Sequence, residues 1–407
     1  MGKLAGGAVE VEAGQAISIV HADEQPADGS LPTTYADLAR DVRAGDAILV
    51  DDGLIRMRVE GVEGDRVRCR VEVGGTVKDR KGINLPGVRV SAPALTEKDL
   101  ADLAFGAQLG VDFVCLSFVR SPRDIVQAKR LLDDHGARVP IIAKIEKPEA
   151  VDDLDAILDA TDGVMVARGD LGVEMGAEKV PLIQKRCIEE ANRRGKLVIT
   201  ATQMLESMVT STFPTRAEAS DVANAVLDHT DAVMLSAETA TGRHPALVVE
   251  TMRNIIREIE RSERYQQKTL PPLELPVTSN AIAHGAAAAA ASLPEVTAIA
   301  CISGHGIAPI LLSDYRPRVP ILGLTHDLDA CRRLAAYWGV LGIPFQLDAS
   351  EGTEGTIERA EALLLERGLV ARGDKIVITL AVPAGRGLHT NTLKVHRVGA
   401  APSTAGD

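Results

Sequence analysis

The chain has 407 residues and a mass of 43.1 kDa, a length typical of about two to four domains. Its net charge is −12 and only 2% of its residues are aromatic, which argues against the basic surface and stacking rings of nucleic-acid-binding proteins. No apolar run approaches the roughly 20 residues that span a bilayer, no signal peptide is visible, and the five cysteines have no C-x-x-C spacing. We therefore expect a cytoplasmic protein with reduced thiols and with no nucleic-acid or membrane partner.

The first region, residues 1–91, is rich in glycine and valine and contains short alternating apolar runs. Runs at 47–50, 55–59 and 66–73 have the pattern of β-strands, and the Asp- and Gly-containing segments between them are typical of turns. We predict a small all-β domain over 1–91.

The second region, residues 92–270, alternates buried strands with amphipathic helices. Strands that are apolar throughout, each followed by a helix, indicate a parallel sheet covered on both faces. The predicted strands are 112–117, 139–145, 163–167, 197–201 and 231–235, and the predicted helices are 124–132, 150–160, 180–194 and 217–227. A repeat of roughly 30 residues suits a (β/α)₈-type barrel, of which this region holds five strands and not eight.

The third region, residues 271–407, begins at a proline-containing linker (Pro271, Pro272 and Pro276). An alanine-rich helix at 280–293 is predicted to precede a further set of strands separated by helices. These strands are 296–302, 319–324, 375–380 and 392–398. We predict a separate α/β domain of the doubly wound type.

Polar residues collect at the carboxyl ends of the predicted barrel strands, where parallel α/β folds place their active sites. Lys144 and Glu146 end one strand and point to the same face, because they are two residues apart. Gly169 and Asp170 follow the next strand, and Thr202 follows the one after. We expect these five residues to form one site.

Two carboxylates, Glu146 and Asp170, repel each other unless a cation lies between them. Oxygen ligands without histidine suit Mg²⁺, which keeps some of its waters and takes substrate oxygens. Gly169 lets its N–H approach a bound anion, and the Thr202 hydroxyl can donate or accept a proton. The alternative for Lys144 is a structural ion pair with a neighbouring carboxylate. Spacing alone thus predicts a Mg²⁺-dependent barrel enzyme for a small anionic substrate, without naming the reaction.

The residues around this site closely resemble motifs of the pyruvate kinase family. The resemblance covers about residues 5–398 and is carried by long motifs in the same order. They are Ile142-Ala143-Lys144-Ile145-Glu146, Met165 to Glu174 (MVARGDLGVE), Ala201 to Met208 (ATQMLESM), Pro214 to Val226 (PTRAEASDVANAV), Asp51 to Ile55 (DDGLI) and Arg80 to Gly87 (RKGINLPG).

The resemblance implies phosphoryl transfer from phosphoenolpyruvate to ADP, giving pyruvate and ATP as the last step of glycolysis. By similarity, Lys144 is catalytic and stabilises charge on the phosphoryl group and on the enolate, while Glu146 and Asp170 bind Mg²⁺. The backbone N–H groups of Gly169 and Asp170 and the Thr202 hydroxyl bind the substrate carboxylate. Thr202 is also catalytic, on the route that delivers a proton.

The family resemblance further implies that residues 1–91 form a lid, whose Asp52 and Lys81 approach the nucleotide when it closes. It also implies a K⁺ requirement and a homo-oligomer, commonly a tetramer. For Arg168 we expect a structural ion pair. The Asn-x-Ser and Asp-Thr-Lys motifs that hold K⁺ in the family do not occur in this sequence.

The missing motifs belong to a family segment that supplies the first three barrel strands. We therefore expect the barrel to be incomplete through N-terminal truncation, which leaves the activity of these 407 residues in doubt. Two alternatives stay open. One is a Mg²⁺-dependent lyase or aldolase of pyruvate-type substrates on the same barrel. The other is a non-catalytic subunit that assembles with a full-length paralogue.

Overall fold

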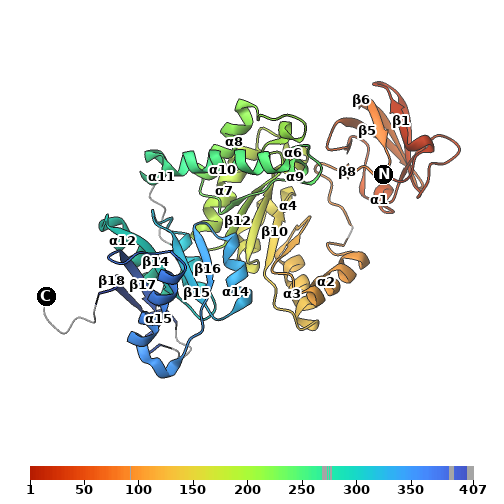
Figure 1. Cartoon of the computed structure of the whole chain (residues 1–407). Coiled ribbons are helices and arrows are strands. Elements are labelled where there is room, and N and C mark those ends of the chain that lie inside the picture. Colours follow the sequence, from red (N-terminus) through yellow and green to blue (C-terminus); the bar gives the residue numbers. More distant parts are fainter. Residues whose placement is uncertain (92, 268–272, 274, 276, 385–388, 401–407) are drawn as a thin grey trace.

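The computed structural model describes residues 1–400 except 92, 268–272, 274, 276 and 385–388. It contains three main sheets, and Figure 1 shows them arranged in chain order from one end of the molecule to the other. No helix among the described residues is long and apolar enough to cross a membrane.

The N-terminal part is an all-β unit, as predicted. Its six-stranded sheet has the order β3-β2-β6-β5-β4-β8, and β1 pairs with β7 in a separate ribbon. Its elements are η1 (Ala5–Gly7), β1 (Ala8–Val11), β2 (Ala16–His21), β3 (Leu31–Thr33), α1 (Leu38–Asp41), β4 (Ala47–Val50), β5 (Ile55–Glu63), β6 (Arg66–Val73), β7 (Gly75–Lys78) and β8 (Ile83–Asn84). The sequence predicted β4, β5 and β6, and β4 and β6 have the predicted limits. The inward residues of these three strands, such as Ile48, Met57 and Val67, are fully buried.

The middle part contains a parallel sheet of five strands in the order β13-β12-β11-β10-β9, which confirms the predicted number. The strands are β9 (Val114–Leu116), β10 (Ile141–Ile145), β11 (Gly163–Ala167), β12 (Leu197–Ala201) and β13 (Ala232–Val233). The helices and turns are α2 (Glu97–Leu109), α3 (Pro122–Asp134), α4 (Pro148–Asp152), α5 (Leu154–Ala160), α6 (Arg168–Met175), α7 (Val180–Arg193), η2 (Glu206–Val209), α8 (Arg216–Leu227), α9 (Ala237–Ala240), α10 (Pro245–Arg261) and α11 (Glu263–Gln267). Within the described residues, β9 and β13 are the edge strands.

The single helix predicted over 150–160 is wrong, because two helices occupy this segment. Asp153 separates α4 from α5 with a backbone at φ −102° and ψ 24°, outside the α-helical region. The remaining predicted helices of this part correspond to α3, α7 and α8 within two residues at each end.

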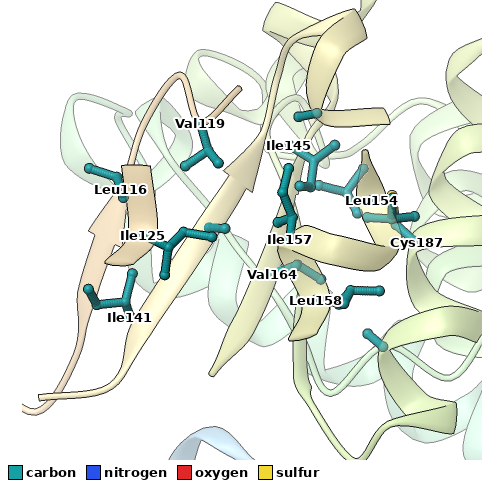
Figure 2. Close-up of a cluster of buried hydrophobic side chains, with 14 of the residues drawn as sticks. Leu116, Val119, Ile125, Ile141, Ile145, Leu154, Ile157, Leu158, Val164 and Cys187 are labelled. Atoms are coloured by element: carbon teal, nitrogen blue, oxygen red, sulfur yellow. The ribbon is translucent and has the colours of Figure 1, made fainter. Parts of the chain in front are cut away.

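The sheet is buried on both faces, which explains why its strands are apolar throughout. Ile141, Ala143 and Ile145 of β10 pack with side chains of α3, α5 and α7, and Figure 2 shows part of this cluster. Ile142, between them, belongs to a separate cluster with Met165 and Leu197 of β11 and β12. Lys144 shares the face of Ile142, so a charged group stands at the end of an apolar face.

The C-terminal part is an α/β unit with the strand order β16-β15-β14-β17-β18, in which β18 alone is antiparallel to its neighbour. Its elements are α12 (Thr278–Ser292), β14 (Val296–Ile302), α13 (Ile307–Ser313), β15 (Ile321–Thr325), α14 (Leu328–Arg333), η3 (Leu334–Ala336), β16 (Val340–Pro344), η4 (Ala349–Glu351), α15 (Gly352–Glu366), β17 (Lys375–Leu380) and β18 (Thr392–Arg397). Two core clusters, one with α15 and one with α12 and α13, cover the two faces, as a doubly wound fold requires. The linker prolines lie outside the described residues.

Candidate active site

Lys144 and Glu146 meet at the carboxyl end of β10. Lys144 Nζ lies 2.6 Å from Glu146 Oε1 and donates to Ser117 Oγ at 2.9 Å. Glu146 is fully buried, and its Oε2 accepts a 2.7 Å hydrogen bond from Phe118 N. The side chain of Lys144 is 24% exposed, so its ammonium group reaches solvent from an otherwise apolar strand. The prediction that these two residues point to the same face is confirmed, and the ion pair given as the alternative for Lys144 is also present.

The two oxygens of the Glu146 carboxylate are bonded unequally. Among the described residues Oε1 has an ion pair with the Lys144 ammonium at 2.6 Å but no hydrogen-bond partner. A fully buried carboxylate is costly without an opposite charge, and here Lys144 supplies that charge. Oε1 therefore fits the role of a metal ligand if a metal ion joins or replaces Lys144 at this atom.

Asp170 provides a second carboxylate in the first turn of α6. Burial and then the negative charge of Glu146 raise its pKa, and the Lys144 ammonium partly offsets this. Excess negative charge of this kind favours a bound cation. The described residues contain no cluster of three or more His, Cys, Asp or Glu side chains suited to a metal. Two carboxylates suit Mg²⁺, which takes its other ligands from water and substrate.

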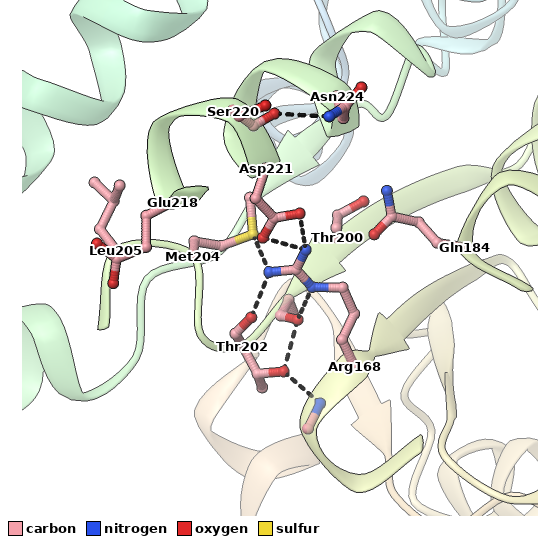
Figure 3. Close-up of polar contacts among 12 residues, drawn as sticks. Arg168, Gln184, Thr200, Thr202, Met204, Leu205, Glu218, Ser220, Asp221 and Asn224 are labelled. Carbon is pink, nitrogen blue, oxygen red and sulfur yellow. Dashed lines mark hydrogen bonds and ion pairs between the residues drawn. The ribbon is translucent and has the colours of Figure 1, made fainter. Parts of the chain in front are cut away.

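Thr202 and Gly169 connect the ends of β12 and β11. The Thr202 hydroxyl accepts a hydrogen bond from Gly169 N at 2.9 Å and donates to the carbonyl of Ala201 at 2.7 Å (Figure 3). Thr202 and Gln203 have φ values of 70° and 53°, in the left-handed region. A positive φ is unfavourable for a β-branched residue such as threonine, and such strain is typical of functional sites.

A cavity of about 1050 Å³ lies between the all-β unit and the barrel strands. Asp52 and Gly53 line it from the all-β unit, and Gly169, Asp170 and Thr202 line it from the barrel. Asp52 also adds to the negative charge felt by Asp170. The structure thus brings Asp52 to the site.

Lys81 lies elsewhere in the all-β unit. Its ammonium pairs with Asp51 at 2.8 Å, and it is not among the described residues that line the cavity. Lys144 and Glu146 are likewise not among those lining residues, although both act electrostatically on Asp170.

Sequence reasoning missed the residues that tie the all-β unit to the barrel. Glu174 Oε1 accepts from Asn84 of β8 at 3.1 Å and from Lys147 at 2.6 Å, and Glu174 is buried. Glu174 lies one turn after Asp170 on α6, and this spacing was the available signal. The contact fixes one point at which the β unit meets the barrel.

Arg168 forms the ion pair that the sequence predicted, and its partner is Asp221 of α8. Both carboxylate oxygens of Asp221 accept from Arg168 Nη1, at 2.7 and 2.6 Å. The partner could not be identified from sequence, because it lies 53 residues further along the chain.

Comparison with known proteins gives two family matches. The family model described as "Pyruvate kinase, barrel domain" matches residues 1–249, and "Pyruvate kinase, alpha/beta domain" matches residues 280–396. Relatives named pyruvate kinase include proteins of Mycobacterium tuberculosis (strain ATCC 25618 / H37Rv) and Mycobacterium intracellulare. They are 44% and 45% identical over 400 residues, which is 98% of this chain and 84% of each relative.

A more distant relative with the same name, from Staphylococcus aureus (strain MRSA252), is 42% identical over 397 residues. This match covers 97% of the chain and 67% of the relative. The truncation expected from the sequence gains no support from these matches and stays a prediction. Because two models of this family match residues 1–249 and 280–396 and the relatives are 42–45% identical, the chain belongs to the pyruvate kinase family.

Proposed function

We propose that this chain transfers the phosphoryl group of phosphoenolpyruvate to ADP, giving ATP and pyruvate in the last step of glycolysis. The observation that carries the proposal is the set of Lys144, Glu146, Asp170 and Thr202 at the carboxyl ends of three adjacent strands. A cation, an ammonium group and polar donors together suit a reaction in which negative charge moves between phosphate and enolate.

Glu146 and Asp170 are the residues that would hold Mg²⁺, since Glu146 Oε1 accepts no hydrogen bond and the negative charge around Asp170 is only partly offset by Lys144. When bound, the ion supplies positive charge for the oxygens of the transferring phosphoryl group. The family generally uses K⁺ as well, but the motifs that hold it do not occur in this sequence, so no residue here is assigned to K⁺.

Lys144 would neutralise charge on the phosphoryl group and on the enolate that remains after transfer. Its hydrogen bond to Ser117 and its ion pair with Glu146 hold the ammonium in place before substrate binds. Preorganised charge of this kind lowers the barrier, because no rearrangement is needed during the reaction.

The N–H groups of Gly169 and Asp170, at the start of α6, would bind the substrate carboxylate together with the Thr202 hydroxyl, once the Gly169 N–H leaves its present acceptor, Thr202 Oγ1. Thr202 would also deliver the proton that converts enolate to pyruvate. Its hydroxyl donates to the Ala201 carbonyl here, so the O–H bond has to rotate about Cβ–Oγ1 before it donates elsewhere.

The domains are proposed to be 1–91, 92–270 and 271–407, with the first acting as a lid. Asp52 already lines the cavity, and Lys81 would move toward the nucleotide on closure. We also propose a cytoplasmic homotetramer, as is common in the family.

The deciding experiment measures pyruvate formation by the 407-residue protein from phosphoenolpyruvate and ADP, with Mg²⁺ and K⁺. The Glu146→Ala protein serves as the blank. Activity above the blank supports the proposal, and also shows that the five-stranded sheet suffices. Pyruvate release from an aldol substrate without ADP would favour the lyase alternative. Absence of both activities would contradict the proposed function for this chain.

A further inference from the structure

The side chain of Arg168 bonds to residues of two other segments of the protein, the one that follows β12 and helix α8. It starts at the first residue of α6, is 10% exposed, and crosses to the segment that follows β12 (Figure 3). Nε donates to the Ala201 carbonyl at 3.2 Å, and Nη2 donates to the Thr202 carbonyl at 2.7 Å and to Met204 Sδ at 2.7 Å.

The two carbonyls belong to the peptide planes on either side of the Thr202 Cα. Because peptide groups are planar, fixing both planes fixes φ and ψ of the residue between them. Arg168 therefore holds Thr202 at a φ of 70°, which this residue would not adopt unaided. The same backbone setting directs the hydroxyl to the N–H of Gly169, the residue next to Arg168.

All three nitrogens of the guanidinium have partners within the protein. Nε bonds Ala201, Nη1 bonds both oxygens of Asp221, and Nη2 bonds Thr202 and Met204. Arg168 lines the cavity, but its guanidinium is already engaged by protein atoms on every nitrogen.

Asp221 anchors the guanidinium from the opposite side. It lies on α8 and neutralises the charge of Arg168, which is otherwise nearly enclosed. A lysine at position 168 would keep the ion pair but has one ammonium nitrogen, which cannot span both carbonyls in the planar arrangement.

We propose that Arg168, anchored by Asp221, is a positioning residue that orients the Thr202 hydroxyl for its part in the reaction. The proposal rests on the proposed function, in which Thr202 contacts the substrate. Arg168 acts only through Thr202, so its effect must vanish once the hydroxyl is gone.

A double-mutant cycle with R168K, T202A and the R168K/T202A double variant tests this. We expect R168K to lower kcat by about 100-fold, the usual effect of a misplaced group, and to change KM by no more than about threefold. In the T202A background, R168K should lower kcat by no more than about twofold, because the two residues act as one unit. The proposal would be overturned if the two substitutions lowered kcat independently, so that their fold-changes multiplied in the double variant. It would also be overturned if R168K raised KM and left kcat unchanged.

The matched control is R316K, since Arg316 is another buried, ion-paired arginine and lies near the opposite end of β12. It should leave kcat and KM at wild-type values. Hydrogen exchange of the peptide 201–210 gives a second readout, which does not need activity. R168K should speed exchange there and R316K should not, and equal exchange in R168K and wild type would overturn the proposal. If the wild-type protein forms no pyruvate, the proposed function fails, and the exchange measurement alone decides the role of Arg168.

Discussion

Ion pairs lie at both ends of the five-stranded sheet, but the two ends differ in how completely hydrogen bonds satisfy their carboxylates. At the amino end, Asp162 accepts from Ile141 N at 2.9 Å and pairs with Lys129 at 2.9 Å. Asp231 accepts from Val198 N at 2.9 Å and pairs with Arg316 at 2.8 Å. Each aspartate thus ties the start of one strand to a cation from another element.

At the carboxyl end fewer hydrogen bonds reach the carboxylates. Glu146 Oε1 has an ion pair with Lys144 but no hydrogen bond, and the half-buried Asp170 carboxylate has no hydrogen bond within the described residues. Carboxylate oxygens that hydrogen bonds leave open can take a ligand. The comparison teaches that pairing by itself is uninformative, and that the number of unsatisfied oxygens separates the two ends.

The strongest test of this comparison removes one lysine near each end of β10. Lys144 lies at the carboxyl end, and Lys129 pairs with Asp162 at the amino end. Lys144→Ala should lower kcat by about 10³-fold with a modest change in KM, because a preorganised charge on the reacting atoms is lost. Lys129→Ala should leave both constants unchanged, since Lys129 pairs with Asp162 at the other end. Steady-state kinetics of both variants check this. Equal losses in the two variants would show that the ends do not differ.

Arg316 belongs to the C-terminal unit, and its ion pair with Asp231 joins that unit to the amino end of the five-stranded sheet. This contact permits a second test, of protein stability. Arg316 is 4% exposed, and its removal leaves Asp231 buried without its cation. We expect Arg316→Met to lower the free energy of unfolding by about 3–5 kcal/mol, as for other broken buried pairs. Denaturant unfolding measures this loss.

Arg332 is the matched control for Arg316. It pairs with Asp112 just before β9, but its side chain is 52% exposed. Solvent screens such pairs, so Arg332→Ala should leave the unfolding midpoint unchanged. If the two arginine variants unfold alike, burial is not what distinguishes these domain contacts.

Much of the fold was predictable because the apolar pattern of its strands is clear. β6, which alternates, and β11, β12, β14 and β17, which are buried almost throughout, have the limits expected from sequence. The prediction failed where burial is partial or local. β16 (VLGIP) contains three aliphatic residues, but only Ile343 is buried, and Gly342 and Pro344 interrupt the strand pattern. The break at Asp153 depends on backbone angles that the helical pattern of 150–160 does not reveal.

The site was predictable in part for a related reason. The contact of Lys144 with Glu146 follows from strand alternation within one segment. The partners of Arg168 could not be inferred, because Ala201, Thr202 and Asp221 lie 33 to 53 residues away and meet it only after the strands pair. Local periodicity predicts neighbours on one element, whereas these contacts depend on which elements become adjacent.

The smallest expected effect concerns Asp314, a buried aspartate beside the Arg316–Asp231 pair. Burial and then the negative charge of Asp231 raise the pKa of Asp314 well above its ordinary value of 3.8, and Arg316 opposes this. The folded protein therefore holds this group protonated at a pH where the unfolded chain ionises it. As the pH rises above the unfolded value, stability is lost progressively until the folded pKa is passed.

Asp314→Asn removes this titration while keeping the size of the side chain. We expect the variant to melt at the wild-type temperature near pH 3.8 and a few degrees higher at pH 7, because only the wild type loses stability over that interval. Melting curves across this range measure the difference. A variant that gains nothing at pH 7 would mean that Asp314 ionises without penalty in the folded protein. The amino end of the sheet would then accommodate a second carboxylate beside Asp231, and the contrast with the carboxyl end would be weaker.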